Sequence, residues 1–289
     1  MQVVTLIAAP GGLSPDTADS LRARWQGGPL RWLAPGEAAE FEVEAEPADL
    51  WETWEALQGQ GTDLLLQPAG PRAKRMLLAD MDSTMIRQEC IDELAAVAGV
   101  GPHVAAITAR AMNGEIDFES ALRERVALLR GLPESVIDDV LRDRITLMPG
   151  GPALLATMKA HGAHAVLVSG GFLSFAHKVA RTLGFDEARA NTLLSENGHL
   201  TGHVAEPILG REAKVQALQE ITARLGLAPQ DVLAVGDGAN DLGMLRLAGA
   251  GVALHAKPAV QQECRLRVNH GDLTALLYLQ GYARDDFAA

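Results

Sequence analysis

Cysteine is nearly absent from the chain. Its 289 residues include only Cys90 and Cys264, and neither lies in a Cys-x-x-Cys or mixed Cys/His pattern. Structural zinc sites and disulfide-stapled small domains need several cysteines at short spacings, so both classes are excluded. So few thiols, far apart in sequence, fit a reducing compartment, and we expect a cytoplasmic protein.

Long apolar runs are also missing. No stretch of the sequence approaches the roughly 20 consecutive apolar residues that a membrane-spanning helix needs. Residues 1–10 lack the basic leader and the long apolar centre of a secretion signal, and they are better interpreted as a first strand. We therefore expect no membrane partner.

Basic residues are outnumbered by acidic ones. The chain has 25 Lys and Arg against 37 Asp and Glu, which gives a net charge of −12. Such a surface repels nucleic acid and anionic membranes at long range, so neither is an expected partner. A phosphorylated small molecule remains an acceptable substrate if a metal ion and a few cations line its pocket.

Aromatic residues are scarce as well, at 4% of the chain, whereas apolar residues of all kinds reach 48%. The core therefore has ample apolar material, and small aliphatic side chains must fill most of it. A length of 289 residues suits two domains, or one large domain with an insertion.

Residues 1–70 form the first segment, with eleven acidic residues against three arginines. Residues 3–8, 30–33, 41–45 and 62–67 are predicted to be strands, and 41–45 alternates with period two, as a strand with one exposed face should. Helix signals, such as Ser14 before Pro15, predict helices at 15–25 and 48–57. The resulting order, βαββαβ, predicts a small α+β sandwich that ends in a Pro-Ala-Gly-Pro linker at residues 68–71.

Residues 75–289 have the pattern of a parallel α/β domain. Apolar runs at 76–79, 165–168 and 232–235 are each followed by small or polar residues and then a helix. Such runs are typical of strands that are buried on both faces, so we expect a Rossmann-like parallel sheet core. Ligands of these sheets bind beyond the carboxyl ends of the strands, where this chain has Asp80 and Asp82, Ser169-Gly170-Gly171, and residues 236–241.

The connection between the first two of these strands is too long for a simple crossover. Its sequence predicts helices at 91–98, 104–112, 118–129 and 134–142, separated by Gly and Pro. We interpret residues of about 87–147 as an inserted helical cap. Residues 193–201 predict a β-hairpin with Asn197-Gly198 as its turn.

Asp80 and Asp82 stand two residues apart in an Asp-x-Asp-x-Thr pattern that ends at Thr84. Two carboxylates this close repel each other unless a cation, a shared proton or strong hydrogen bonds stabilise them. One favoured use is a metal-assisted site in which one Asp is the nucleophile and the other moves a proton. The alternative is ordinary helix capping, for which Asp and Thr are also suited.

Four patterns follow one another along the chain: Asp-x-Asp-x-Thr at 80–84, Ser-Gly-Gly at 169–171, Lys214, and Gly-Asp-Gly-x-Asn-Asp at 236–241. Their order and residue types resemble the haloacid dehalogenase-like phosphohydrolases, over residues 75 to about 285. Four patterns in order are far more specific than one. Helix capping is therefore disfavoured as the whole explanation of the aspartate pair.

The resemblance becomes closer in the cap. Glu89 and the stretch Arg-Glu-Arg-Val-Ala-Leu-Leu at 123–129, together with the aspartate pair, look like the phosphoserine phosphatase family. This resemblance implies that Asp80 attacks phosphorus to form an aspartyl-phosphate. It implies that Asp82 protonates the departing serine oxygen and then activates the hydrolytic water.

The same resemblance implies a ligand set. Mg²⁺ would be held by the side chains of Asp80 and Asp237 and by the backbone carbonyl of Asp82. Phosphate oxygens would be met by the Ser169 hydroxyl, the Gly170 amide and the Lys214 ammonium.

Substrate selection is expected from the cap. By resemblance, Glu89 binds the serine ammonium, Arg125 binds the serine carboxylate, and Met112 and Phe118 close the pocket. Supporting positions are also implied: Asn240 near the phosphate, Asp241 orienting Lys214 or the water shell of the metal, and Thr84 beside the aspartate pair.

Each of these residues also has a plainer interpretation. Glu89 and Arg125 suit solvent-facing helix charges, and Lys214 suits a surface lysine. Asp241 suits a cap for the following helix. Cys90 is best interpreted as a small buried residue.

The leading functional hypothesis is Mg²⁺-dependent hydrolysis of O-phospho-L-serine to L-serine and phosphate, the last step of L-serine biosynthesis. A phosphotransferase that passes the phosphoryl group to an alcohol such as homoserine would need the same two aspartates. A serine-sensing binding protein with a silent core is disfavoured, because every expected catalytic position is filled. The amino-terminal extension of this family often looks like an ACT-like regulatory domain. Whether residues 1–70 bind serine, form a homodimer or support the core stays open.

Overall fold

The structure is a computed structural model that describes residues 1–112 and 115–288. Contacts between Cα atoms group the chain into two compact units. The first comprises Met1–Leu77, Pro149–His164 and Gly226–Ala289, and the second comprises Leu78–Met148 and Ala165–Leu225. The domain boundaries expected from the sequence stay a prediction.

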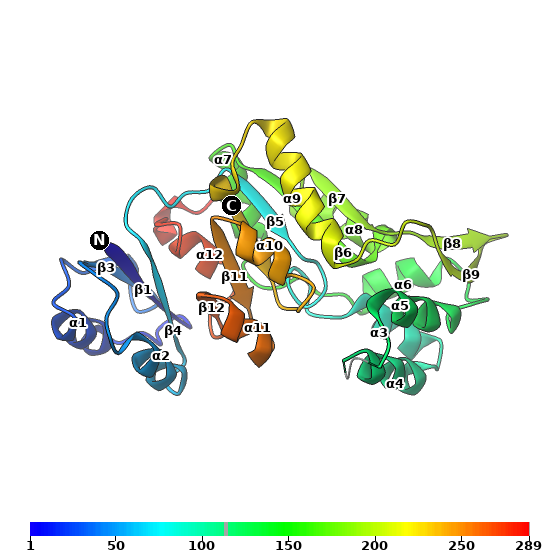
Figure 1. Cartoon of the computed structure of the whole chain (residues 1–289), viewed down its shortest axis with the longest axis horizontal. Coiled ribbons are helices and arrows are strands. Elements are labelled where there is room, and N and C mark those ends of the chain that lie inside the picture. Colours follow the sequence, from blue (N-terminus) through cyan, green and yellow to red (C-terminus); the bar gives the residue numbers. More distant parts are fainter. Residues whose placement is uncertain (113–114, 289) are drawn as a thin grey trace. The chain divides into compact units, whose positions relative to one another are not determined.

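The amino-terminal segment has the predicted βαββαβ order. Its elements are β1 Gln2–Ala8, α1 Pro15–Arg24, β2 Arg31–Ala34, β3 Ala38–Val43, α2 Leu50–Gln58 and β4 Thr62–Pro68. The strands form one antiparallel sheet in the order β2-β3-β1-β4, with both helices on the same face (Figure 1). Helix α1 starts where the sequence predicts, because the Ser14 hydroxyl accepts the Thr17 amide at 3.1 Å.

Six strands form a second, parallel sheet. They are β5 Met76–Ala79, β6 His164–Phe172, β7 Glu187–Asn191, β10 Val232–Gly236, β11 Ala250–Leu254 and β12 Leu266–Val268, in the order β12-β11-β10-β5-β6-β7. All three apolar runs identified in the sequence are strands of this sheet, and every residue of β5 is fully buried. The predicted Rossmann-like core is therefore confirmed.

Helices fill the segment between β5 and β6. They are α3 Cys90–Val97, α4 Gly101–Met112, α5 Phe118–Ala127, α6 Val136–Asp143 and α7 Gly151–Ala160. Figure 1 shows α3, α4, α5 and α6 gathered together, as expected of an inserted helical group. The hairpin of β8 Leu193–Glu196 and β9 His199–Val204 packs on α5, and its Asn197-Gly198 turn has positive φ at both residues, as the sequence predicts.

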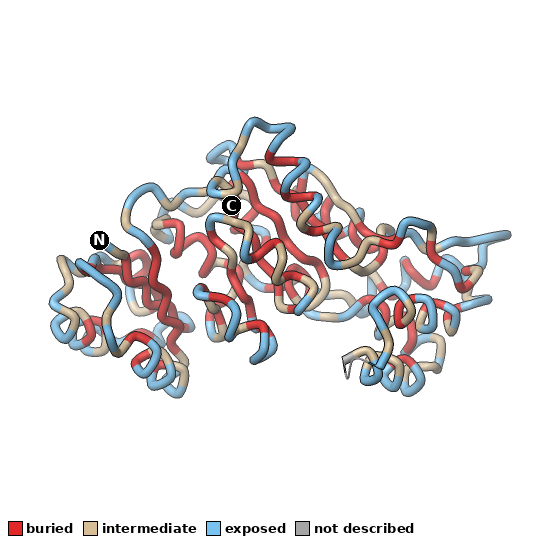
Figure 2. Tube along the Cα trace, viewed as in Figure 1, coloured by how far each residue is buried: buried red, intermediate tan, exposed pale blue. Residues whose placement is uncertain are grey.

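The remaining elements complete the two units. They are α8 Leu173–Leu183, α9 Arg211–Leu225, α10 Leu242–Leu247, α11 Pro258–Glu263 and α12 Ala275–Tyr278, with short 3-10 turns at Pro229–Asp231 and Arg284–Asp286. Burial follows the strands and one face of each long helix (Figure 2). No helix within residues 1–112 and 115–288 is both long and apolar enough to span a membrane.

Within the first unit, the amino-terminal segment is attached to the last part of the chain. The buried Asp63 carboxylate accepts the amides of Asn269, His270 and Gly271 at 2.8, 3.0 and 2.8 Å. Charge-assisted bonds of this kind are stronger than neutral ones, so Asp63 is a principal attachment point.

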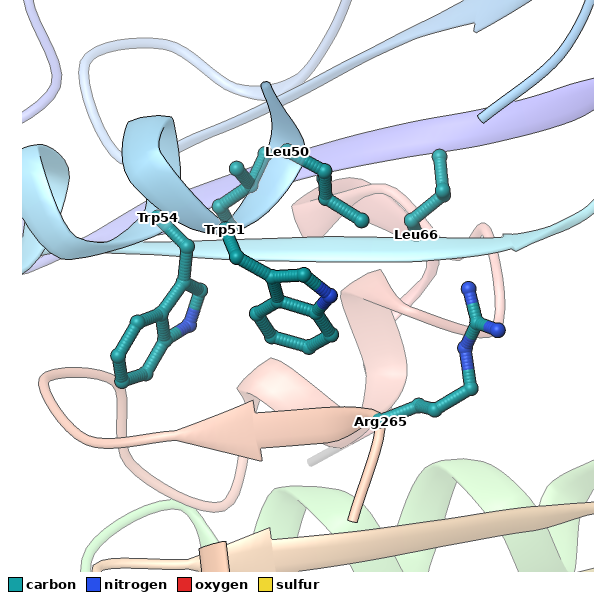
Figure 3. Close-up of a pocket in the computed structure, with 6 residues that line it drawn as sticks. Leu50, Trp51, Trp54, Leu66 and Arg265 are labelled. Atoms are coloured by element: carbon teal, nitrogen blue, oxygen red, sulfur yellow. The ribbon is translucent and has the colours of Figure 1, made fainter. Parts of the chain in front are cut away.

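An apolar pocket lies beside this attachment. Figure 3 shows Trp51 and Trp54 of α2 facing Arg265, the residue before β12. The Arg267 guanidinium lies 4.3 Å from the Trp51 ring centroid, a cation–π contact. This pocket contains none of the residues that the sequence assigns to catalysis.

Candidate active site

The chain makes a tight turn directly after β5. The amides of Thr84, Met85 and Ile86 all point at the Met81 carbonyl oxygen, at 3.3, 2.8 and 3.1 Å. Ser83 reverses the chain with a φ of 55°, a value that non-glycine residues rarely adopt. This turn places the Asp80 and Asp82 side chains at the end of a buried strand.

Asp80 forms a buried ion pair with Lys214 of α9. The distance from Lys214 Nζ to Asp80 Oδ1 is 2.6 Å, and the two side chains are 2% and 7% exposed. Burying a lysine is costly unless it is paired, so the surface interpretation of Lys214 is wrong. The pairing holds Asp80 as an anion beside a cation.

Asp82 has a different environment from Asp80. Its Oδ1 atom accepts the Cys90 amide at 3.3 Å. Burial, and then the negative charge of Glu89, raise the pKa of Asp82 to about 7. One aspartate of the pair is therefore held charged by a lysine, while the other is able to carry a proton near neutral pH.

The Ser-Gly-Gly segment lies against Asp82. A Cβ atom on Gly171 would lie 2.6 Å from Asp82 Oδ2, closer than real contacts allow. The buried Ser169 hydroxyl accepts the Gly171 amide at 2.9 Å, which closes the turn. Glycine is thus required where the β6 turn approaches the carboxylate.

Residues 169–171 form a bulge in strand β6. Between β6 and β7 the pairing passes from Val168 opposite Arg189 to Phe172 opposite Asn191, so two extra residues of β6 leave the ladder. The bulge contains residues 169–171 and frees their backbone groups for other partners.

The predicted substrate residues lie on the helices between β5 and β6. Glu89 precedes α3, is exposed, and accepts a hydrogen bond from the Ser83 hydroxyl at 2.8 Å. Burial lowers the pKa of the Arg125 guanidinium on α5, and the charges of Asp92 and Glu89 act in the opposite direction. Arg125 is therefore a partly desolvated cation rather than a fully solvated one.

Phe118 covers the bulge. A Cβ atom on Gly170 would lie 3.2 Å from Phe118 Cζ, and one on Gly210 would lie 3.5 Å from its Cδ1. The ring is 37% exposed, as suits a side chain at a pocket mouth. Met112 ends α4, and its side chain lies outside the described residues.

The Gly-Asp-Gly segment follows β10 in the first unit. Asp241 is fully buried, and its carboxylate accepts the Gly238 amide at 2.9 Å. It stands at the N-cap position, directly before α10, but makes no side-chain capping bond to that helix, so capping does not explain it. Asn240 lies between these residues and is half-buried.

Two carboxylates lie together after β10. Asp237 and Asp241 each offer an oxygen, and the two oxygens lie within 4.8 Å of each other. Such a pair suits a hard divalent cation. Thr84 ends the Asp-x-Asp-x-Thr pattern and is fully buried, and its hydroxyl has no hydrogen-bond partner among the described residues.

Asn191, at the end of β7, was missed by the sequence analysis. It is 2% exposed, and its side chain bonds the backbone of Gly170 and of Leu209. The available signal was a polar residue at the end of a short segment, as at the other strand ends. It is weak because residues 187–191 lack the apolar run that marks the other strands of the sheet.

The sequence matches one protein-family model and is similar to several known proteins. The model of the haloacid dehalogenase-like hydrolases matches residues 77–246. The phosphoserine phosphatase of Streptomyces coelicolor is 43% identical over 260 residues, covering 88% of this chain and 63% of that protein. The phosphoserine phosphatase of Haemophilus influenzae is 46% identical over 204 residues, covering 71% of this chain and 65% of that protein. The chain thus spans less than two thirds of the length of these two relatives.

Solved structures agree with these relatives. A hydrolase of the same family from Salmonella enterica serovar Typhi has a TM-score of 0.87 at 30% identity, with 98% of each chain covered. A phosphoserine phosphatase with an analogue of its phospho-aspartyl intermediate has a TM-score of 0.66 at 38% identity, covering 71% of this chain and 98% of that one. The matched residues include the aspartate pair, the Ser-Gly-Gly bulge, Lys214 and the Gly-Asp-Gly segment, and the chain belongs to the haloacid dehalogenase-like hydrolases.

Proposed function

We propose that this chain is a phosphatase that hydrolyses O-phospho-L-serine to L-serine and phosphate. The observation that carries the proposal is the division of roles within the aspartate pair. Asp80 is an anion 2.6 Å from the Lys214 ammonium, and the Asp82 pKa is about 7. The names of the relatives at 43% and 46% identity support phosphoserine as the substrate.

The first chemical step assigns a role to each carboxyl group. An Asp80 oxygen attacks phosphorus, and the bond between phosphorus and the serine oxygen breaks as the aspartyl-phosphate forms. Asp82 transfers its proton to the departing serine oxygen, which leaves as the neutral alcohol. A pKa of about 7 allows Asp82 to hold that proton at neutral pH.

In the second step Asp82 acts as a base and Asp80 is the leaving group. Asp82, now ionised, takes a proton from water as the water oxygen attacks phosphorus. The bond between phosphorus and Asp80 breaks, which releases phosphate and regenerates the Asp80 carboxylate. The Ser169 hydroxyl, the Gly170 amide and the Lys214 ammonium are the donors that we assign to the phosphoryl oxygens.

We propose Mg²⁺ as the cofactor, because hard cations prefer oxygen ligands such as the carboxylates of the Asp-x-Asp and Gly-Asp-Gly patterns. We assign the Asp80 and Asp237 carboxylates and the Asp82 backbone carbonyl as its protein ligands, with Asp241 as a supporting anion that is fixed by the Gly238 amide. When bound, the cation neutralises the repulsion between the nucleophile and the phosphate.

Recognition of the amino acid is assigned to the helical insertion. Glu89 supplies a negative charge for the serine ammonium, and Arg125 supplies a planar donor for its carboxylate. Pocket closure is assigned to Phe118, whose ring lies against Gly170. We keep the sequence-based assignments of Met112 to pocket closure and of Asn240 to phosphate binding as expectations.

The decisive experiment measures phosphate release from phosphoserine with Mg²⁺, for the unmodified chain and for Asp80→Asn. We expect release by the parent and none by the variant. Asp19→Asn, an exposed aspartate on α1, is the matched control and should retain parental activity. Absence of release by the parent, or undiminished release by Asp80→Asn, would contradict the proposal. Product analysis with added homoserine tests phosphoryl transfer to an alcohol.

Three further assignments go with this proposal. We assign residues 1–70 to a small regulatory or dimerising domain and residues 75–289 to the catalytic core, with a cap at about 87–147. A homodimer would form through the amino-terminal segment, which has a core of its own around Leu6, Phe41 and Leu64. A cytoplasmic location agrees with the two free, buried cysteines.

A further inference from the structure

The Asn191 carboxamide connects two segments that lie far apart in the sequence. Its Nδ2 atom donates to the Gly170 carbonyl at 2.9 Å and to the Leu209 carbonyl at 3.1 Å. Its Oδ1 atom accepts the Leu209 amide at 2.7 Å. Both amide hydrogens and the oxygen are thereby used, and the side chain is 2% exposed.

The first of these segments is the bulge at residues 169–171. Its two adjacent glycines have no Cβ atom, so the backbone around Gly170 rotates easily. The Gly170 amide, which we assign to the phosphate, belongs to the peptide before this residue, and the Gly170 carbonyl belongs to the peptide after it. The Asn191 carboxamide holds that carbonyl and the Ser169 hydroxyl holds the Gly171 amide of the same peptide, so rotation at Gly170 is restricted and its amide keeps one direction.

The second segment leads into the helix that carries Lys214. Leu209 lies two residues before α9 begins at Arg211, and Lys214 lies in the first turn of that helix. The carboxamide bonds both backbone groups of Leu209, which fixes the position and the rotation of that residue. The start of α9 is therefore tied to the bulge by one side chain.

Phe118 packs over both segments at the same place. Its ring atoms lie 3.2 Å from the ideal Cβ position of Gly170 and 3.5 Å from that of Gly210. Movement of either segment would therefore change the contact with a residue that we assign to pocket closure. A change at Asn191 should reach the phosphate donors and the pocket mouth together.

We propose that Asn191 is a positioning residue, which sets the distance between the 169–171 bulge and the Lys214 helix so that both meet one phosphoryl group. This inference rests on the proposed function for the identity of the group that is bound. It assigns no chemical step to Asn191, which acts through Gly170 and Leu209.

The test uses Asn191→Asp, which keeps the shape of the side chain and its acceptor for the Leu209 amide. The variant loses both donors and places an anionic oxygen against two carbonyl oxygens. The matched control is Asn269→Asp in the first unit, where the Asn269 Nδ2 atom donates to Gln58 and Gln261 at 2.8 and 3.1 Å. Both variants make the same chemical change, to a buried asparagine at 191 and to a partly buried one at 269.

We expect kcat of Asn191→Asp to fall by about 10- to 100-fold, since a displacement of about 1 Å at the reacting group has an effect of that size. The KM for phosphoserine should change less than kcat, because Glu89 and Arg125, which we assign to the charged groups of serine, are not among the residues that Asn191 bonds. Affinity for orthovanadate with Mg²⁺, measured by calorimetry, should fall in parallel with kcat. Lowering the pH should restore part of the loss, because protonation of the introduced carboxylate restores one donor.

A purely structural role predicts a different pattern. It would lower the melting temperature while kcat of the folded protein and vanadate affinity match those of Asn269→Asp, and that result would overturn the inference. A rise in KM at unchanged kcat would overturn it as well.

Vanadate binding and a second substrate, p-nitrophenyl phosphate, separate this inference from the proposed function. If the parent cleaves only p-nitrophenyl phosphate, or binds vanadate without turnover, phosphoserine hydrolysis is rejected. Weaker binding or slower turnover by Asn191→Asp then still supports positioning. If the parent does not bind vanadate, both proposals fail.

Discussion

Lys214 Nζ lies 2.6 Å from Asp80 Oδ1, and neither side chain is more than 7% exposed. A buried pair of this kind stabilises the fold only while both members are present, since each is the counter-charge of the other. The same contact that we assign to catalysis therefore contributes to stability, and the two contributions are separable by experiment.

Lys214→Met should lower the free energy of unfolding by about 3–5 kcal/mol, because it removes the cation beside a buried carboxylate. The measurement is urea denaturation in the presence of EDTA. The double variant Asp80→Asn/Lys214→Met carries neither charge and should regain a large part of the loss. Losses that simply add in the double variant would contradict the pairing.

Gly171→Ala should reduce kcat by about tenfold or more, because a Cβ atom there would lie 2.6 Å from Asp82 Oδ2 and must displace the proton-transferring group. Gly210→Ala is the control. Its Cβ atom would meet Phe118 at 3.5 Å, an ordinary contact, and its steady-state kinetics should stay near the parental values. Equal effects of the two substitutions would argue against the close approach.

The pH dependence of kcat/KM should change when the negative charge of Glu89 is removed. Asp82 must be protonated to act as the acid, and burial and Glu89 raise its pKa to about 7, so kcat/KM should fall as the pH rises above that value. Glu89→Gln removes the negative charge, lowers the Asp82 pKa and moves this fall to lower pH. The substrate is an alkyl phosphate such as glycerol 2-phosphate, which has no ammonium group for Glu89 to bind and whose alkoxide leaving group needs the proton of Asp82.

Glu93→Gln is the control for this profile, because Glu93 is a neighbouring carboxylate that is not among the main causes of the Asp82 shift. Its profile should match that of the parent. A shift to higher pH in Glu89→Gln would reverse the sign and exclude the assignment.

Cys90 should be unreactive in the folded protein. Burial, and then the charges of Asp82 and Glu89, raise the pKa of its thiol well above the usual value, so the reactive thiolate is scarce. Mass spectrometry after iodoacetamide treatment should find no modification of the native chain and two modifications in urea. Rapid native modification of Cys90 would show that the thiol is accessible.

Asp63→Asn should lower the free energy of unfolding by about 2–3 kcal/mol, because the amide replaces a carboxylate that accepts three backbone amides. Thermal unfolding measures this loss. Turnover per folded molecule should be unchanged, since Asp63 lies outside the predicted site. The exposed Asp19→Asn should leave the melting temperature unaltered.

The sequence predicts the parts of the fold that have local signals. The strand at 76–79 is a short apolar run that ends in polar residues, and the hairpin turn is an Asn-Gly pair. Helix α7 was not predicted, because the Pro-Gly-Gly-Pro stretch at 149–152 suggests a loop. In the structure Gly150 has a φ of 79° and the helix begins after it, with Pro152 in its first turn, where proline is tolerated.

The residue types of the site were predictable from the sequence, but the burial and the partners of each side chain were not. The order of the four patterns identifies Lys214, yet nothing in a helix sequence reveals that its side chain is buried. The distinction between Asp80 and Asp82 depends on Lys214 and Glu89, which the fold brings to different members of the pair. The partners of Asn191 are backbone groups. Since every residue type has these groups, the sequence gives no sign of the bonds.

The three amides that bind Asp63 lie 206 to 208 residues further along the chain. During synthesis the amino-terminal segment is completed long before residues 269–271 leave the ribosome. Asp63 must remain hydrated through that interval, because its amide partners become available only after 206 to 208 further residues have been made. Attachment of the amino-terminal segment through Asp63 is therefore a late step in folding, which follows the synthesis of β12.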